Sequence, residues 1–167
     1  MIVFDASTLI LIAKADLLNT ILNSIGMRVA IPVEVERECC KGKKTLDGLS
    51  IEAAIKKSQI EVIAVKNRKL IFKLQDDFSL GLGEAEAIAL GLAASALAVG
   101  IDDKNGIDAC KLLGIPLITS IGLLVRSCEK RLLNITEAQS ALMDMARYGR
   151  YKPSIIQAAM LRIEALK

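Results

Sequence analysis

The sequence predicts an α/β fold in which a mostly parallel sheet is covered by helices on both faces. Short apolar segments rich in β-branched residues alternate along the chain with longer segments of helical period, and this alternation is typical of parallel strands joined by helices. Apolar residues make up 53% of the chain, enough for a folded core. The length of 167 residues is typical of one domain. We therefore expect residues 1–167 to form a single domain.

The local pattern of apolar residues predicts the elements at the start of the chain. Residues 2–4 are apolar and partly β-branched, which predicts a buried strand that ends at Asp5. A cap at Ser7 or Thr8 then begins a helical period that continues to about residue 25. Residues 27–31 predict a second strand, and Pro32 suits the first turn of the next helix.

The middle of the chain begins with a basic loop at residues 41–48. Ser50 is positioned to cap a helix to about residue 57. Residues 60–65 alternate as a strand does, and residues 70–74 predict a short helix before the Gly81-Leu82-Gly83 turn. The clearest helix follows at residues 84–94, which are rich in Ala and Leu with acids in the first turn.

The last third repeats the strand–helix pattern. Residues 96–101 predict an apolar strand that ends at Asp102 and Asp103. The remaining elements that we expect are a helix at 106–113, a strand at 116–119, and helices at 120–130, 136–147 and 154–166.

Composition excludes several classes of function. The chain has no His, which excludes Ser-His-Asp and Cys-His catalysis and His-ligated zinc. Aromatic residues are 3% with no Trp, so base-stacking platforms are scarce, and a net charge of +3 permits a polyanionic partner without requiring one. The start has no basic leader, and the uncharged stretch 87–101 is too short for a membrane span. We expect a cytoplasmic protein with no membrane partner.

Acidic residues recur where predicted strands end. Asp5 and the pair Asp102-Asp103 each follow a strand, and ligands of parallel sheets bind beyond the carboxyl ends of the strands. Further acids stand near predicted helix starts, namely Glu34, Glu36, Glu38, Glu84 and Glu86. Converging carboxylates repel one another unless a divalent cation neutralises them, and oxygen ligands suit Mg²⁺ or Mn²⁺. The sequence thus predicts a metal site that supports hydrolysis without histidine.

Several motifs together resemble the PIN-domain family, and within it the VapC-like toxin ribonucleases and their relatives. The motifs are Asp5-Ala6-Ser7-Thr8, Ile31-Pro32 with Val35 and Glu38, Gly83-Glu84-Ala85-Glu86, Ile101-Asp102-Asp103-Lys104, and residues 113–122. Each acidic motif is weak alone. Their order and spacing, together with their placement at strand ends, make the resemblance fairly specific, and it covers nearly the whole chain.

The resemblance implies a three-layer α/β/α sandwich and cleavage of RNA phosphodiesters by activated water with Mg²⁺ or Mn²⁺. The family's metal-binding catalytic acids match four residues here: Asp5, Glu38, Glu84 and Asp102. Ser7 or Thr8, and also Ser120, match positions where a hydroxyl would hold a water on the metal or orient a ligand. Toxin-type members are commonly dimers silenced by a small antitoxin, so the resemblance implies a homodimer and an antitoxin partner.

Two choices within the motifs stay open. Residues two apart on a helix point in nearly opposite directions, so only one of Glu84 and Glu86 can face the metal. Two points favour Glu84. It follows Gly83 directly, and its separation from Asp102 in the sequence resembles the family's usual spacing between the third and fourth acids. The same comparison favours Asp102 over Asp103, which could instead cap the following helix.

Basic residues near the acids are candidates for RNA contact. They are Arg37, Lys41, Lys43, Lys44 and Lys104. A charged loop is as often simply solvated, and Lys104 could instead pair with Asp103. The rival function is a catalytically inactive PIN-like domain that binds a protein or RNA. A dinucleotide site at Gly81-Leu82-Gly83 is rejected, because the third glycine is missing and the acids that follow would repel a pyrophosphate.

Overall fold

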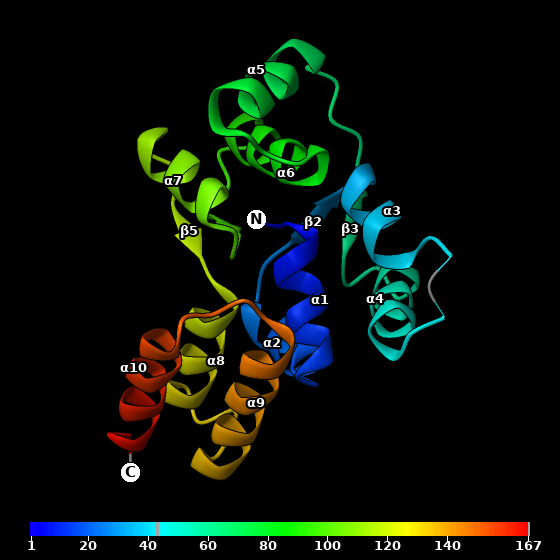
Figure 1. Cartoon of the computed structure of the whole chain (residues 1–167). Helices are drawn as coiled ribbons and strands as arrows, with labels where there is room; N and C mark the ends of the chain where they lie inside the picture. The colour runs from blue at the N-terminus through cyan, green and yellow to red at the C-terminus, as the bar shows by residue number, and fades with distance from the viewer. Residues whose placement is uncertain (43, 167) are drawn as a thin grey trace.

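A sheet of five parallel strands forms the centre of the computed structural model, which describes residues 1–42 and 44–166. The strand order is β3-β2-β1-β4-β5, and every pairing is parallel (Figure 1). The strands are β1 (Ile2–Phe4), β2 (Val29–Pro32), β3 (Glu61–Ile63), β4 (Ala98–Gly100) and β5 (Leu117–Ile118). The chain order reverses between β1 and β4, so the sheet has a topological switch point there.

Ten helices of the described residues join and cover the strands. They are α1 (Ala6–Lys14), α2 (Leu18–Ile25), α3 (Val33–Cys40), α4 (Leu46–Lys56), α5 (Arg68–Phe78), α6 (Leu82–Ala93), α7 (Lys104–Leu112), α8 (Ser120–Glu129), α9 (Ile135–Tyr148) and α10 (Pro153–Glu164). One core contains the inward faces of α1 to α4 and α8 to α10, and the other contains those of α5 to α7. The predicted three-layer α/β/α sandwich is confirmed.

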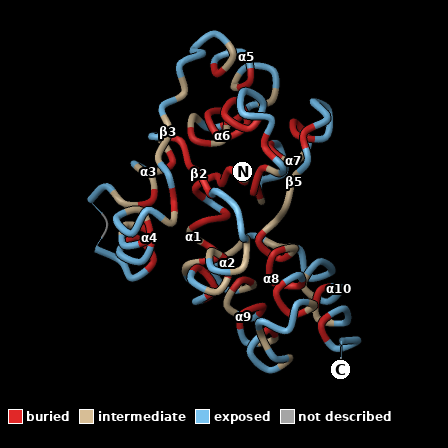
Figure 2. Tube along the Cα trace, turned by 180° about the vertical axis from the view of Figure 1, so that it is seen from behind, coloured by how far each residue is buried: buried red, intermediate tan, exposed pale blue. Residues whose placement is uncertain are grey.

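The central strand shows why both faces need cover. Ile2 and Phe4 point into the core under α1 and α8, whereas Val3 points into the core under α6. All three side chains are buried, and Figure 2 shows the buried trace running through the sheet and along the inward helix faces. A strand buried on both faces reads as a continuous apolar run rather than an alternating one.

One predicted helix is two helices. The helical period from residue 7 to about residue 25 is interrupted after Lys14, and α1 and α2 meet at an angle of 116°. Asp16 adopts a left-handed backbone (φ 56°), and the N–H of Leu17 donates to the carbonyl of Ile12 at 3.0 Å, which closes the end of α1. The apolar pattern continues across the break because both helices bury their faces in the same core.

Other helix starts also differ from the predictions. Asp5, rather than Ser7 or Thr8, is the N-cap of α1, because its side chain accepts the Thr8 N–H. Thr45 precedes α4, so Ser50 lies inside that helix. Helix α5 is a full eleven-residue helix rather than a short one.

Membrane-spanning potential is weak in the described residues. No single helix there is long and apolar enough to cross a bilayer. The bent pair α1 and α2 passes by length and composition, but its apolar faces are part of the core.

Candidate active site at the carboxyl edge of the sheet

Asp5 lies at the carboxyl end of β1, fully buried. Its backbone N–H donates to the carbonyl of Gly100 at 3.0 Å, which holds it beside the end of β4. Its Oδ1 accepts the N–H of Thr8 at 2.8 Å, and its Oδ2 accepts the hydroxyl of Ser7 at 2.7 Å. Burial raises the pKa of Asp5 from 3.8 to about 7, the charge of Asp102 adds to the rise, and the bonds from Ser7 and Thr8 oppose it.

Asp102 stands next to Asp5, just beyond the paired strand β4. The hydroxyl of Thr8 donates to Asp102 Oδ2 at 2.8 Å, so one residue binds both acids, Asp5 through its N–H and Asp102 through its side chain. The other oxygen, Oδ1, accepts the hydroxyls of Ser120 at 3.1 Å and of Tyr151 at 2.6 Å. The N–H of Ser120, in the first turn of α8, lies 3.1 to 3.2 Å from both oxygens, where the helix dipole favours a negative charge.

Glu38 and Glu84 form a second pair of acids, held where α3 meets α6. Glu38 accepts the N–H of Gly83. A Cβ at Gly83 would lie 2.7 Å from Glu38 Oε1, so the glycine allows this close approach of the two helices. Burial is the main cause that raises the pKa of Glu38; Glu34 and Glu84 add to it, and Arg37 and Gly83 oppose it. Burial also raises the pKa of Glu84, with Asp103 adding to the rise.

Glu84 and Asp103 each also cap a helix. Oε2 of Glu84 accepts the N–H of Gly81 at 2.9 Å at the start of α6. Asp103 is the exposed N-cap of α7, and its Oδ1 accepts the backbone N–H groups of Asn105 at 2.7 Å and Gly106 at 3.3 Å. These acids therefore have a structural role that needs no ligand.

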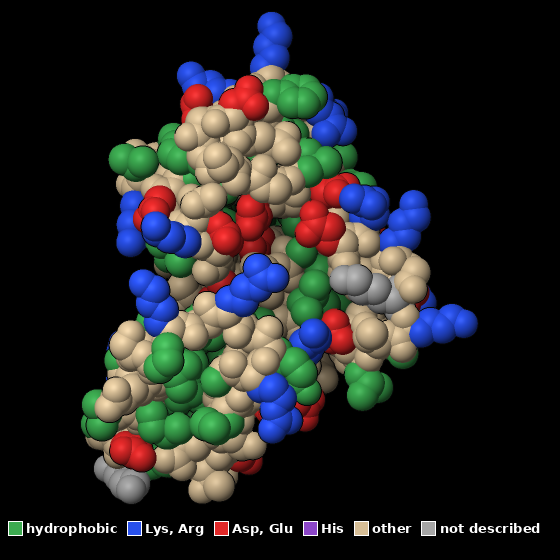
Figure 3. Space-filling model, viewed as in Figure 1, with side chains coloured by type: hydrophobic (Ala, Val, Ile, Leu, Met, Phe, Trp, Pro, Cys, Tyr) green, Lys and Arg blue, Asp and Glu red, His purple; other side chains and the backbone are tan. Residues whose placement is uncertain are grey.

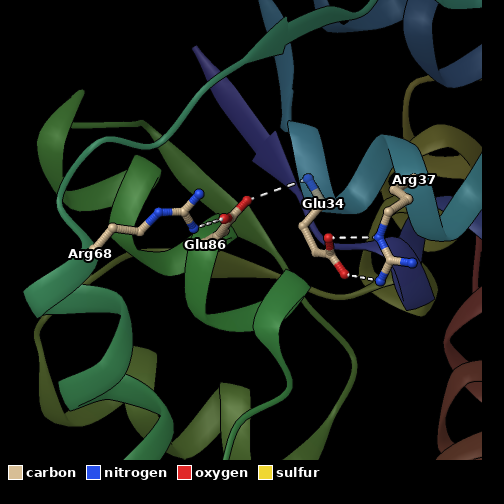
Figure 4. Close-up of polar contacts among 4 residues, drawn as sticks. All are labelled: Glu34, Arg37, Arg68 and Glu86. Atoms are coloured by element: carbon tan, nitrogen blue, oxygen red, sulfur yellow. Dashed lines mark hydrogen bonds and ion pairs between the residues drawn. The ribbon is translucent and has the colours of Figure 1, made fainter.

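Glu86 is paired with an arginine (Figure 4). It is buried, accepts Arg68 Nη1 at 3.0 Å through Oε1, and accepts the N–H of Glu34 at 3.4 Å through Oε2. The side chain of Glu34 in turn binds Arg37 through both Nε and Nη2 of the guanidinium. Two of the predicted acids of this edge thus have cationic partners.

The four matched acids lack such partners within the described part of the chain. No ion pair there joins Asp5, Glu38, Glu84 or Asp102 to a Lys or Arg. Figure 3 shows acidic side chains gathered in the middle of the face that Figure 1 views. Carboxylates without a cationic partner are the donor set that a hard divalent cation prefers.

The acids are arranged as pairs rather than as one tight cluster. Across residues 1–42 and 44–166, no three Asp, Glu, Cys or His side chains lie close enough together to hold one metal ion. The charge of Asp102 contributes to the raised pKa of Asp5, and the charge of Glu84 contributes to the raised pKa of Glu38. The carboxylate oxygens of these acids are of the donor type that suits Mg²⁺ or Mn²⁺.

The predicted basic residues lie on the surface. Lys41, Lys44 and Lys104 are exposed, and Arg37 is exposed but bound to Glu34. Lys43 lies outside the described residues.

Two residues of this edge were missed by the sequence interpretation. Tyr151 reaches Asp102 across 49 positions, and Arg68 reaches Glu86 across 18. Neither separation in sequence corresponds to the short period of a helix or a strand, so no local sequence pattern could have identified these two residues.

The fold and this edge define a class of α/β/α domain that presents carboxylates beyond adjacent parallel strands at a switch point. The chain matches a family model described as a PIN domain over residues 1–165, and it belongs to the PIN-domain family. This confirms the predicted family. PIN domains have a nuclease-type fold and are typically nucleases; they generally use divalent metals and bind RNA, often with antitoxin partners. No curated protein and no solved structure matched the chain.

Proposed function

We propose that this protein is a divalent-metal-dependent endoribonuclease, formed by one domain over residues 1–167, and that it acts as the toxin of a toxin–antitoxin pair or in RNA processing. One contrast carries the proposal. Glu34 and Glu86 are neutralised by arginines, whereas Asp5, Glu38, Glu84 and Asp102 have no ion pair with Lys or Arg in the described residues. A cation from solution would relieve their repulsion.

The acids are held in place by neutral donors. Ser7, Thr8 and Ser120 direct their hydrogen bonds to the carboxylates, so we assign these hydroxyls to orienting the ligands. Mg²⁺ or Mn²⁺, when bound, would offset charge on the phosphodiester and make a water molecule more acidic. A cation would also favour the ionised form of Asp5, whose burial otherwise favours the neutral acid.

Exposed cations supply the contact with RNA in this proposal. Lys41, Lys44 and Lys104 are free to approach a phosphate backbone, and each contact would make binding weaker in high salt. The proposed protein partners are a second copy of this chain and a small antitoxin.

A second candidate is the catalytically inactive binding module. It is favoured by the absence, in the described residues, of a three-acid metal group and by the capping roles of Glu84 and Asp103. This module would bind RNA or protein without cutting.

Cleavage of single-stranded RNA by the purified protein separates the two candidates. We expect cutting with Mg²⁺ or Mn²⁺, none with a chelator, and a loss of about 100-fold or more in Glu38→Gln, because removing a ligand costs at least as much as removing its supporting partner. Glu36→Gln, on the same helix, is the matched control and should cut normally. RNA binding without cleavage under either metal, or full activity in Glu38→Gln, would refute the nuclease proposal.

A further inference from the structure

We propose that Tyr151 is a positioning residue for Asp102: its hydroxyl fixes one carboxylate oxygen so that the other is directed toward Asp5. The inference rests on the proposed metal-dependent function, because its consequence is metal affinity. Tyr151 lies in the segment between α9 and α10, far along the chain from the four matched acids.

The two oxygens of Asp102 have different surroundings. Oδ2 accepts the hydroxyl of Thr8, whose N–H binds Asp5, so Oδ2 is the oxygen on the side of Asp5. Oδ1 accepts Tyr151 at 2.6 Å and the hydroxyl of Ser120 at 3.1 Å. The N–H of Ser120 lies 3.1 to 3.2 Å from both oxygens and does not distinguish them. The Tyr151 hydroxyl binds Oδ1, so it holds the carboxylate in the rotation that keeps Oδ2 on the side of Asp5.

Tyr151 also contacts the other donor. Its hydroxyl oxygen lies 2.5 Å from Ser120 Oγ. The two hydroxyls have only two protons for three contacts, so with the Tyr151 proton on Asp102 Oδ1, the Ser120 proton goes either to Asp102 or to Tyr151. Hydrogen bonds to an ionised oxygen are short and strong. The buried Ser120 hydroxyl has two acceptors within reach, whereas the phenol hydroxyl of Tyr151 is at the end of a rigid ring with two torsions. The ring therefore fixes the rotation of the Asp102 carboxylate.

The backbone before Tyr151 leaves room for the ring. A Cβ at Gly149 would lie 2.7 Å from Cε2 of Tyr151 and 2.8 Å from the carbonyl oxygen of Met145. Only glycine allows the ring to lie this close to the end of α9. Pro153 then begins α10 directly after an extended turn at Lys152, so the segment is fixed from both ends.

Metal affinity measured without RNA tests the inference apart from activity. Partners that hold a metal ligand are worth about 10- to 100-fold in affinity, so Tyr151→Phe should bind Mn²⁺ roughly tenfold more weakly by titration calorimetry. Tyr148→Phe is the matched control: Tyr148 is exposed and stacks on Lys14 at 5.1 Å, and its variant should bind Mn²⁺ as wild type does.

The control variant Tyr148→Phe also allows the hydrogen bond of the Tyr151 hydroxyl to be followed by spectroscopy. The chain has two Tyr and no Trp, so in Tyr148→Phe the remaining tyrosine signal comes from Tyr151. Resonance Raman spectra of this variant should report a tyrosine hydroxyl that donates a hydrogen bond, both without metal and with Mg²⁺. A loss of the donor signature when Mg²⁺ binds would overturn the inference, because Tyr151 would then leave Asp102 in the loaded state.

Gly149→Ala provides a second variant that keeps the hydroxyl but displaces the ring, and it should weaken Mn²⁺ binding as Tyr151→Phe does. Equal or tighter Mn²⁺ binding in Tyr151→Phe would overturn the inference while the proposed function stood. Failure of the wild type to bind Mn²⁺ would overturn both. Thermal unfolding in chelator checks that each variant is folded.

Discussion

Replacing Asp5 by asparagine should stabilise the metal-free protein at neutral pH. The asparagine side chain retains an oxygen that accepts the Thr8 N–H, but it has no charge to bury. Burial raises the pKa of Asp5 to about 7, so the folded wild type binds a proton more readily than the unfolded chain. A raised carboxyl pKa makes the folded state less stable as pH increases. This is the reverse of the usual behaviour of an ion-paired aspartate.

The size of the effect follows from the two pKa values. Between 3.8 and about 7 the unfolded chain is ionised and the folded chain is not, and each pKa unit corresponds to about 1.4 kcal/mol. The wild type should therefore lose about 4 kcal/mol relative to Asp5→Asn over this range, and the difference should be constant at higher pH. Below the unfolded pKa the wild-type carboxyl is neutral in both states, and the advantage of the Asp5→Asn variant should disappear.

Urea unfolding in chelator, followed by circular dichroism from pH 4 to 8, measures this difference directly. Asp16→Asn is the control, because Asp16 is exposed and its left-handed backbone suits asparagine equally well. Parallel stability curves for the wild type and Asp5→Asn across the range would refute the argument from burial. Saturating Mg²⁺ should remove most of the difference by stabilising only the wild type.

Three further variants probe the surroundings. Gly83→Ala places a methyl group 2.7 Å from Glu38 Oε1, so RNA cleavage should fall about tenfold in a rate assay. Arg68→Ala leaves the buried Glu86 carboxylate without its cation, which should lower the free energy of unfolding by about 2 kcal/mol in urea. Gly91→Ala puts a methyl group 2.5 Å from a buried valine of β4, so chemical denaturation should show a loss of about 1–3 kcal/mol from overpacking.

The fold was predictable because its signals are local. Four of the five strands are short apolar runs, and β3 lies in a segment that alternates between polar and apolar residues. Each helix except the first was separated from its neighbours by turn residues or strands. The break between α1 and α2 was missed because Asp16 carries no glycine or proline signal, although its backbone is left-handed. The cap of α1 was missed because Asp5 both ends a strand and begins a helix.

The site was predictable only in part. Strand-end position and the family resemblance together brought Asp5 and Asp102 to one edge before any contact was known. The choice between Glu84 and Glu86 depends on Arg68, which pairs with Glu86 from another helix. That pairing, like the bond from Tyr151 to Asp102, arises from packing between segments that are remote in sequence.

The acid edge is assembled from residues that leave the ribosome at very different times. Thr8 binds both Asp5 and Asp102, and Asp102 comes 94 residues after Thr8 in the chain. Tyr151 follows Asp102 by another 49 residues. At synthesis rates of about 5–20 residues per second, the first acid waits on the order of ten seconds for its last partner. The carboxylate edge therefore stays incomplete while the nascent chain is beside its own messenger RNA and the ribosomal RNA, which would keep the proposed nuclease inactive during its own synthesis.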